Sequence, residues 1–327
     1  MRTSHRRVLV LGSGQLQGLL EELKESCQVV CMDENPLDRK AGIRRMQALG
    51  GGWDCVLFGE GWQAVGRMDA DILGPLVPMG MVSMRGAGYD RVDVDWLTSV
   101  HTIYANNPVA VRVPTAEFTL ALMLATTKNL LPLDRSVRHR DPGEEVETGD
   151  DMPGLTIGIV GLGGIGAEVA RRLVAFGPRL LYSQRRRNRE LEVGGIEYVQ
   201  ELDAMLKECD MVSLHCPLTP ATHHLLDARR LALLRGGILI NTSRGPVVDE
   251  VALVKALKSG HVRKAGLDVF EREPEVEDYL RTSPRVVLSP HRAAFTPHTA
   301  ERSGRELVAN AVAYIRTGRP NTPVNDL

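Results

Sequence analysis

Short, nearly continuous apolar runs alternate along the chain with longer stretches in which apolar residues recur at helical spacing. Apolar runs of this kind are typical of strands that are buried on both faces, and their alternation with helices predicts parallel sheets in an α/β protein. The predicted strands lie within residues 7–14 and at 29–32, 55–58, 81–84, 101–104, 156–160, 180–182, 211–215, 237–241, 265–269 and 286–288.

The stretches between these runs predict helices, and one of them divides the chain. Pro114 begins a long apolar helix over 115–131, because proline is favoured in the first turn of a helix. The helix lies between two α/β halves, so we expect a hinge between a domain of residues 1–105 with 295–327 and a domain of residues 106–294. Further helices are predicted at 39–49, 201–208, 228–234, 250–258 and 300–316, with a helical stretch around 16–23.

Composition limits the class of protein. The chain has 327 residues, 43% hydrophobic and 25% charged, which suits a soluble protein with two domains. Lys and Arg (40) balance Asp and Glu (41), so nothing points to a nucleic acid or an anionic membrane. No apolar run reaches the ~20 residues of a membrane span. The five cysteines lack Cys-x-x-Cys spacing, which predicts reduced thiols in the cytoplasm and no metal site.

A glycine-rich turn follows the strand predicted at 156–160. Gly161, Gly163 and Gly166 form the pattern G-x-G-x-x-G, and a helical pattern begins at once. In a dinucleotide-binding unit the first glycine permits a sharp turn, the second lets the backbone approach a pyrophosphate, and the third lets the helix pack on the strand. The N–H groups at the start of the helix then hold the phosphates. The strand before and the helix after the motif supply the context that this function requires.

The next predicted strand ends without the acid that usually binds the adenosine ribose. Ser183 or Gln184 stands there, and Arg185, Arg186 and Arg187 follow. The 2′-phosphate of NADP(H) would lie beside these cations, and no carboxylate would repel it. The sequence therefore favours NADP(H). The alternative is that the arginines are only solvated and that NAD(H) still binds.

A second glycine pattern lies near the amino terminus. Gly12, Gly14 and Gly18 follow a predicted strand, and Asp33 ends the next one. The last glycine is one place late, and Pro36 with a basic helix follows the acid. We therefore expect an ordinary βαβ unit here and not a second nucleotide site.

Polar residues follow the buried strands of the second half at the points where those strands end. Arg244 follows one strand, Glu273 the next and His291 the last. Each residue alone has a structural explanation, such as a surface cation or a loop charge. Successive parallel strands, however, end at one edge of a sheet, which is where open α/β sheets bind ligands. We therefore expect these three residues to share a cleft.

A series of short motifs occurs in order at 86–90 (GAGYD), 115–117 (TAE), 161–166 (GLGGIG), 214–219 (LHCPLT), 239–245 (LINTSRG), 267–274 (LDVFEREP) and 289–291 (SPH). Together they resemble the D-isomer-specific 2-hydroxyacid dehydrogenases, in particular the glyoxylate and hydroxypyruvate reductases. The resemblance implies two doubly wound parallel-sheet domains, a flavodoxin-like substrate domain (1–105 with 295–327) and a Rossmann cofactor domain (106–294), joined by hinge helices. It implies a homodimeric NAD(P)-dependent enzyme that transfers a hydride between its cofactor and a small 2-keto acid or D-2-hydroxy acid.

The resemblance also implies a role for each residue of the set. Arg244 would grip the substrate carboxylate with a planar, permanently charged fork. His291 would exchange a proton with the reacting oxygen, and Glu273 would hydrogen-bond His291 and fix its orientation. Backbone N–H groups near Arg85, Gly86 and Ala87 would complete the grip on the carboxylate. The implied cofactor-binding residues are Thr115, Gly161, Gly163, Gly164, Ile165, Gly166, Ser183, Gln184, Arg185, Arg186, His215, Cys216, Pro217, Thr222, Thr242, Ser243 and Asp268.

Two features leave the substrate open. Arg292 and Phe295 follow His291 where smaller residues are commoner in the family. Glu273 disfavours a formate dehydrogenase, since those enzymes resemble this family but carry Gln in its place. A phosphite dehydrogenase-like enzyme and a nucleotide-sensing, corepressor-like binding protein stay as alternatives.

Overall fold

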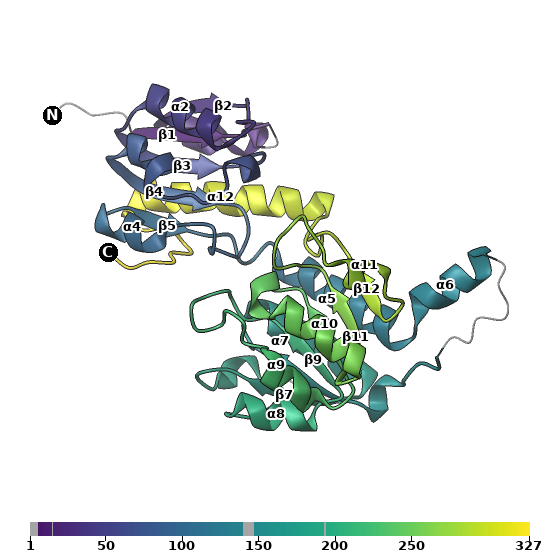
Figure 1. Ribbon diagram of the computed structural model, residues 1–327. Helices are drawn as coiled ribbons and strands as arrows, with labels where there is room; N and C mark the ends of the chain where they lie inside the picture. The colour runs from purple at the N-terminus through teal and green to yellow at the C-terminus, as the bar shows by residue number, and fades with distance from the viewer. Residues whose placement is uncertain (1–5, 15, 140–146, 193) are drawn as a thin grey trace. The chain divides into compact units, whose positions relative to one another are not determined.

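The computed structural model describes residues 6–14, 16–139, 147–192 and 194–327. The sequence at 138–154 is charged, contains Gly and Pro and lacks periodicity, which predicts an exposed linker, and part of it lies outside the described residues. The chain divides into two compact units, Met1–Val111 with Phe295–Leu327 and Arg112–Ala294 (Figure 1). Each unit contains one sheet whose strands are all parallel, which confirms the predicted α/β class. Among the described helices, none is both long and apolar enough to cross a membrane.

The first unit has a five-stranded sheet in the order β2-β1-β3-β4-β5, which is the flavodoxin-like order. Its strands are β1 (Arg6–Leu11), β2 (Cys27–Met32), β3 (Trp53–Phe58), β4 (Met79–Met84) and β5 (Ile103–Ala105). Its helices are α1 (Glu21–Lys24), α2 (Arg39–Leu49), α3 (Ala70–Leu73), α4 (Val94–Ser99) and α12 (Pro297–Thr317). Met46 of α2, Ile72 of α3 and Leu97 of α4 belong to one core, whereas Leu23 of α1 and Leu307 of α12 belong to the other. The sheet is therefore covered on both faces.

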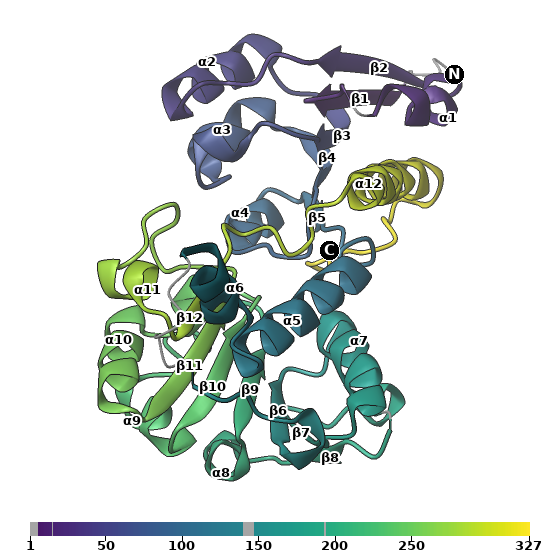
Figure 2. The same cartoon turned by 90° about the vertical axis from the view of Figure 1, so that its right-hand side faces the viewer.

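The second unit has a seven-stranded sheet in the order β12-β11-β10-β9-β6-β7-β8, which contains the Rossmann order. Figure 2 shows α5 and α7 on one side of this sheet and α8, α9 and α10 on the other. The strands are β6 (Thr156–Val160), β7 (Arg179–Ser183), β8 (Glu197–Tyr198), β9 (Met211–Leu214), β10 (Gly237–Asn241), β11 (Val262–Leu267) and β12 (Val286–Leu288). The helices are α5 (Arg112–Thr127), α6 (Leu130–His139), α7 (Gly164–Leu173), α8 (Leu202–Glu208), α9 (Ala228–Leu231), α10 (Glu250–Ser259) and α11 (Asp278–Thr282).

Strand β10 shows why the apolar runs are nearly continuous. Ile238 and Ile240 pack into the core beneath α5 and α7, and Leu239 between them packs into the opposite core. Because side chains alternate across a strand, a strand covered on both faces needs apolar residues at successive positions.

Three predicted elements differ from the structure. The single helix at 115–131 is two helices, α5 and α6, because Asn129 adopts a left-handed conformation (φ 54°) that ends the helix between them. The strand at 265–269 ends at Leu267, where its pairing with both neighbouring strands also ends. The helical stretch around 16–23 is reduced to a short 3-10 turn (Gln17–Leu19) followed by α1.

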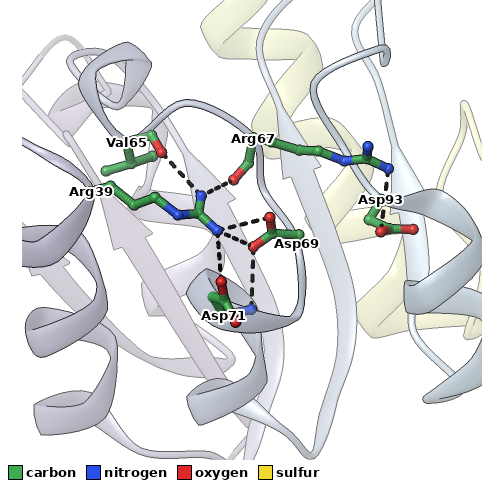
Figure 3. A network of polar contacts seen from close by, with 6 residues as sticks. All are labelled: Arg39, Val65, Arg67, Asp69, Asp71 and Asp93. Atoms are coloured by element: carbon green, nitrogen blue, oxygen red, sulfur yellow. Dashed lines mark hydrogen bonds and ion pairs between the residues drawn. The ribbon is translucent and has the colours of Figure 1, made fainter.

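A polar network fastens the helices on one face of the first sheet (Figure 3). Arg39 Nη2 donates to both carboxylate oxygens of Asp69 at 2.6 and 2.8 Å, and its Nη1 donates to the carbonyls of Val65 and Arg67 at 3.2 and 2.8 Å. Burial acts to raise the pKa of the Asp69 carboxyl, but the hydrogen bonds and the charge of Arg39 outweigh it and lower that pKa. The network joins the starts of α2 and α3, so its role is structural.

Candidate active site

The predicted site residues of the second unit follow the carboxyl ends of its strands. The glycine turn follows β6, His215 follows β9 and Thr242 follows β10, while Asp268 follows β11. Adjacent strands in this parallel sheet are paired up to these ends. The residues therefore line one edge, and the edge includes the point between β6 and β9 where the strand order reverses.

The glycine turn has the geometry of a phosphate cradle. Gly161 has φ 93°, which residues with a side chain rarely adopt. A Cβ atom on Gly166 would lie 2.2 Å from the Gly161 carbonyl oxygen, so only glycine lets α7 approach the turn so closely. Gly163 is the N-cap of α7 and offers no side chain to the N–H groups of the first turn, which begins with Gly164 and Ile165. These donors fit the pyrophosphate of a dinucleotide.

The two residues predicted to stand in place of the ribose-binding acid, Ser183 and Gln184, lie at the end of β7. Strand β7 ends at Ser183, which is buried and whose hydroxyl lies 3.4 Å from the Gln200 carbonyl. Gln184 is the first residue beyond the strand, and its Oε1 accepts the Leu162 N–H at 2.9 Å. The neutral amide of Gln184 thus hydrogen-bonds to the glycine turn and places no negative charge beside it.

The three arginines that follow have different surroundings. Arg187 donates to both oxygens of Glu192 at 2.7 and 3.0 Å. These bonds, followed by the one from the Tyr182 hydroxyl, lower the pKa of the Glu192 carboxyl to about 2. Arg185 and Arg186 are exposed, and neither forms an ion pair with any residue that the structure describes. Two of the three predicted cations are therefore available to an anionic ligand.

The residues after β9 form a compact turn beside the glycines. A Cβ atom on Gly161 would lie 3.0 Å from the Cys216 nitrogen. Thr222 closes this turn by donating to the Pro217 carbonyl at 2.6 Å. His215 Nε2 lies 2.8 Å from a serine hydroxyl, and burial lowers the pKa of this imidazole to about 3, so it is neutral. Burial raises the pKa of the Cys216 thiol to about 11.

The end of β10 is fixed by the side chain of Asn241. Its Oδ1 accepts the Ser243 N–H at 3.0 Å and the Ser243 hydroxyl at 2.8 Å, and its Nδ2 donates to the Arg244 carbonyl at 3.0 Å. The Thr242 hydroxyl lies 2.8 Å from that of Thr119 on α5, whose hydroxyl donates to the Thr115 carbonyl at 2.7 Å. Asn241 is a functional candidate that the sequence argument passed over, although an Asx residue before a turn is a recognisable signal.

His291 and Glu273 form a direct pair. Nδ1 of His291 lies 2.9 Å from Glu273 Oε2, and the other carboxylate oxygen accepts the Phe270 N–H at 3.2 Å. A hydrogen bond from Nδ1–H to the carboxylate leaves Nε2 as the atom that exchanges a proton. His291 has φ 54°, and its side chain is 45% exposed.

Asp268 holds the segment that carries His291. It is fully buried, its Oδ1 accepts the Arg292 N–H at 2.8 Å and the Ser289 hydroxyl, and its Oδ2 accepts the Ala293 N–H at 2.9 Å. The His291 N–H donates to the Asp268 carbonyl at 2.7 Å. These bonds fix the left-handed turn at His291, and the cofactor-binding role that the resemblance implies for Asp268 stays a prediction.

Backbone packing connects Arg244 to the His–Glu pair. Arg244 Nη1 donates to the Ser243 carbonyl at 2.7 Å. The next residue, Gly245, is so close to Phe270 that a Cβ atom would lie 1.9 Å from its carbonyl carbon. Phe270 in turn donates to Glu273, as described above. Arg244, Glu273 and His291 therefore stand on three contiguous strand-end loops of one unit.

The remaining predicted groups lie in the first unit, after β4. Arg85 Nη1 pairs with Glu60 at 2.7 Å, and its Nη2 donates to the Ala300 carbonyl at 3.2 Å. Gly86 has φ 100°, and its carbonyl accepts the Asn107 N–H at 2.8 Å. Asn106 Nδ2 donates to the Ala87 carbonyl at 2.7 Å. Hydrogen bonds that its carbonyl groups accept thus hold this loop. Its N–H groups are the ones predicted to bind a carboxylate.

In the amino-terminal glycine pattern, of which the structure describes residues 6–14 and 16–33, the acid after the second strand contacts the turn. Asp33 Oδ1 accepts the Ser13 N–H at 3.0 Å and also the Ser13 hydroxyl. The acid therefore binds the turn itself, and α1 has only four residues.

A cluster of His223, His224 and Glu271 was missed by the sequence argument because Glu271 is distant in sequence. Their ligand atoms lie within 4.8 Å of one another. His224 Nε2 lies 2.8 Å from Glu271 Oε1, and the two imidazole rings stack at 4.1 Å. The other oxygen of Glu271 accepts the Glu250 N–H at 3.2 Å, so the cluster links the loop after Arg244 to the loop before Glu273.

The fold and this edge define a nicotinamide-dependent oxidoreductase. Residues 120–293 match the family described as D-isomer specific 2-hydroxyacid dehydrogenase, NAD binding domain. The chain belongs to this family and is a 2-hydroxyacid dehydrogenase, which confirms the resemblance found in the motifs.

Individual relatives cover nearly the whole chain. A glyoxylate reductase from Korarchaeum cryptofilum is 41% identical over 301 residues, or 90% of this chain and 88% of the relative. The solved glyoxylate reductase from Paecilomyes thermophila is 30% identical over 98% of both chains, with a TM-score of 0.91. An NADPH-dependent glyoxylate/hydroxypyruvate reductase from Sinorhizobium meliloti, solved in complex with NADP and malonate, is 30% identical over 98% of this chain and 97% of that one, with a TM-score of 0.83.

Proposed function

We propose that this dehydrogenase reduces a small 2-keto acid such as glyoxylate or hydroxypyruvate, with NADPH as the preferred cofactor. The observation that carries the proposal is the pairing of His291 with Glu273 on the edge that also bears Arg244 and the glycine turn. The glyoxylate and hydroxypyruvate reductases among its relatives support the choice of substrate.

In the proposed mechanism, Arg244 binds the substrate carboxylate and polarises the carbonyl. His291, held through Nδ1 by Glu273, delivers a proton from Nε2 to the carbonyl oxygen during reduction and takes it back during oxidation. Asp268 keeps the His291 turn in place. The nicotinamide, when bound, supplies or accepts the hydride. The resemblance also assigns backbone N–H groups of the 85–87 loop to the substrate carboxylate, which stays a prediction.

The preference for NADPH is supported by the ribose side of the glycine turn. The amide of Gln184 replaces a carboxylate, and Arg185 and Arg186 are exposed without ion pairs among the described residues. A 2′-phosphate would gain charge-assisted hydrogen bonds there, and no carboxylate at position 184 would repel it.

A substrate panel run with both cofactors tests these proposals. Glyoxylate, hydroxypyruvate and a bulkier 2-keto acid should be reduced, with kcat/KM higher for NADPH than for NADH. Arg186→Gln should lower kcat/KM for NADPH by about tenfold, since one charged hydrogen bond is lost, and leave the value for NADH unchanged. Arg189→Gln is the matched surface control. A parent enzyme that prefers NADH contradicts the cofactor proposal.

The same panel addresses the alternatives. Phosphite oxidation without turnover of any keto acid would favour a phosphite dehydrogenase. Tight NADPH binding without turnover of any substrate would favour a binding protein.

We also propose a homodimer in which α6 contacts a second copy of the chain. Leu130, Leu133 and Val137 lie on one face of α6 with exposed fractions of 56%, 47% and 79%. Such an apolar face is typical of a helix that becomes covered on association. The double variant Leu133→Glu/Val137→Glu should be monomeric in light scattering, whereas Arg135→Glu on the same helix should remain dimeric. A monomeric parent protein would refute the proposal.

We propose a cytoplasmic location as well, since all five cysteines are free thiols.

A further inference from the structure

Arg112 lies beside the glycine turn although it is distant from it in sequence. A Cβ atom placed on Gly164 would lie 2.5 Å from Arg112 Nε and 3.1 Å from its Cζ. Gly164 is the first residue of α7, and its neighbour Gly163 is the N-cap. The guanidinium group therefore lies directly against the phosphate-binding end of α7.

The charge of Arg112 has no counterpart in the described part of the chain. Its Nε is buried and has no hydrogen-bond partner, and no carboxylate forms an ion pair with it among the described residues. Arg171 and Arg172 in the last turn of α7, in contrast, both pair with Glu168. A buried polar atom without a partner costs stability, so the buried Nε of Arg112 requires an explanation.

Helix geometry makes the position more unfavourable for a cation. Arg112 is the first residue of α5, and the first turn of α5 contains no acidic residue. The amino end of a helix carries partial positive charge, which repels a cation. The guanidinium charge of Arg112 therefore lies where the amino ends of α5 and α7 already carry partial positive charge. A bound anion would offset the positive charge gathered at this place.

We propose that Arg112 is a ligand for the pyrophosphate of the cofactor. The glycine turn supplies backbone N–H groups to the diphosphate, and Arg112 supplies the side-chain cation that the turn itself lacks. A guanidinium group donates several hydrogen bonds in one plane and stays charged, which suits a diphosphate. This role is separate from that of Arg185 and Arg186, which concern the 2′-phosphate alone.

Binding titrations of purified Arg112 variants test the proposal without using turnover. Arg112→Gln should weaken the binding of ADP, NADH and NADPH by a similar factor of about ten or more, because each contains the diphosphate. The affinity for adenosine, which has no phosphate, should not change. Arg112→Lys, which keeps the charge and loses the fork, should fall between the parent and Arg112→Gln. The melting temperature of each variant shows whether it folds.

Arg186→Gln is the matched control, since it should weaken NADPH only. Unchanged affinity of Arg112→Gln for ADP would overturn the assignment. An equal loss of affinity for adenosine and ADP would also overturn it, because it would indicate a distorted site and not a lost phosphate contact. The ADP titration is independent of the proposed substrate and of the NADPH preference. A failure of either proposal therefore leaves this result interpretable.

Discussion

Replacement of His291 by Gln is expected to lower kcat by about 10²- to 10⁴-fold, the usual contribution of a positioned acid–base group. Glutamine can donate a hydrogen bond, but it cannot deliver the proton that the carbonyl oxygen needs. Its amide still fits beside Glu273, and the glycine turn is untouched, so the dissociation constant for NADPH should stay near that of the parent. Single-turnover kinetics and an NADPH titration measure the two quantities separately.

The conformation of His291 requires a second variant. Its φ of 54° lies in the left-handed region, which Asn tolerates better than most residues. His291→Asn should therefore fold and lose kcat to a similar extent. His261→Gln, on the exposed residue before β11 at the opposite end of the sheet, is the matched control and should retain kcat. An active His291→Gln enzyme would refute the proposed role.

Replacement of Arg244 by Gln is expected to have the second largest effect, a loss of about 10²- to 10³-fold in kcat/KM. The variant removes the cation that binds the substrate carboxylate and the developing charge on the carbonyl oxygen. Both KM and kcat should change, whereas His291→Gln should change mainly kcat. Arg244→Lys should recover only part of the loss, because an ammonium group cannot make the two parallel bonds of the guanidinium fork.

The backbone around Arg244 makes the variant informative. The Asn241 side chain and the close contact of Gly245 with Phe270 both hold the backbone of this loop. The fold should therefore survive the change, as circular dichroism would show. Arg235→Gln, at an exposed residue two positions before the same strand, provides the control. Equal kcat/KM values for Arg244→Gln and the parent enzyme would exclude Arg244 from the site.

The local elements were predictable where one physical rule dominated. Helix α2 (Arg39–Leu49) and strand β10 (Gly237–Asn241) have the predicted bounds, because helical spacing and a continuous apolar run leave little choice there. Asn129 was harder to predict, since its left-handed conformation depends on the surrounding structure and not on a turn motif in the sequence. The end of β11 depended on where its neighbours β10 and β12 ended, which is a property of the sheet.

The sequence by itself determined the α/β class, the family and the set of strand-end residues, because each depends on local patterns and ordered motifs. Only the tertiary structure showed that Asp268 holds the turn at His291 and that Gln184 hydrogen-bonds to the glycine turn. It also separated Arg187, which has a partner in Glu192, from Arg185 and Arg186. Arg112 is the clearest case, since nothing in its own neighbourhood in the sequence marks it. Its proposed role follows from its contact with Gly164, which the fold places beside it where α5 packs against α7. Charge balance is set by distances in space, and a sequence does not contain those distances.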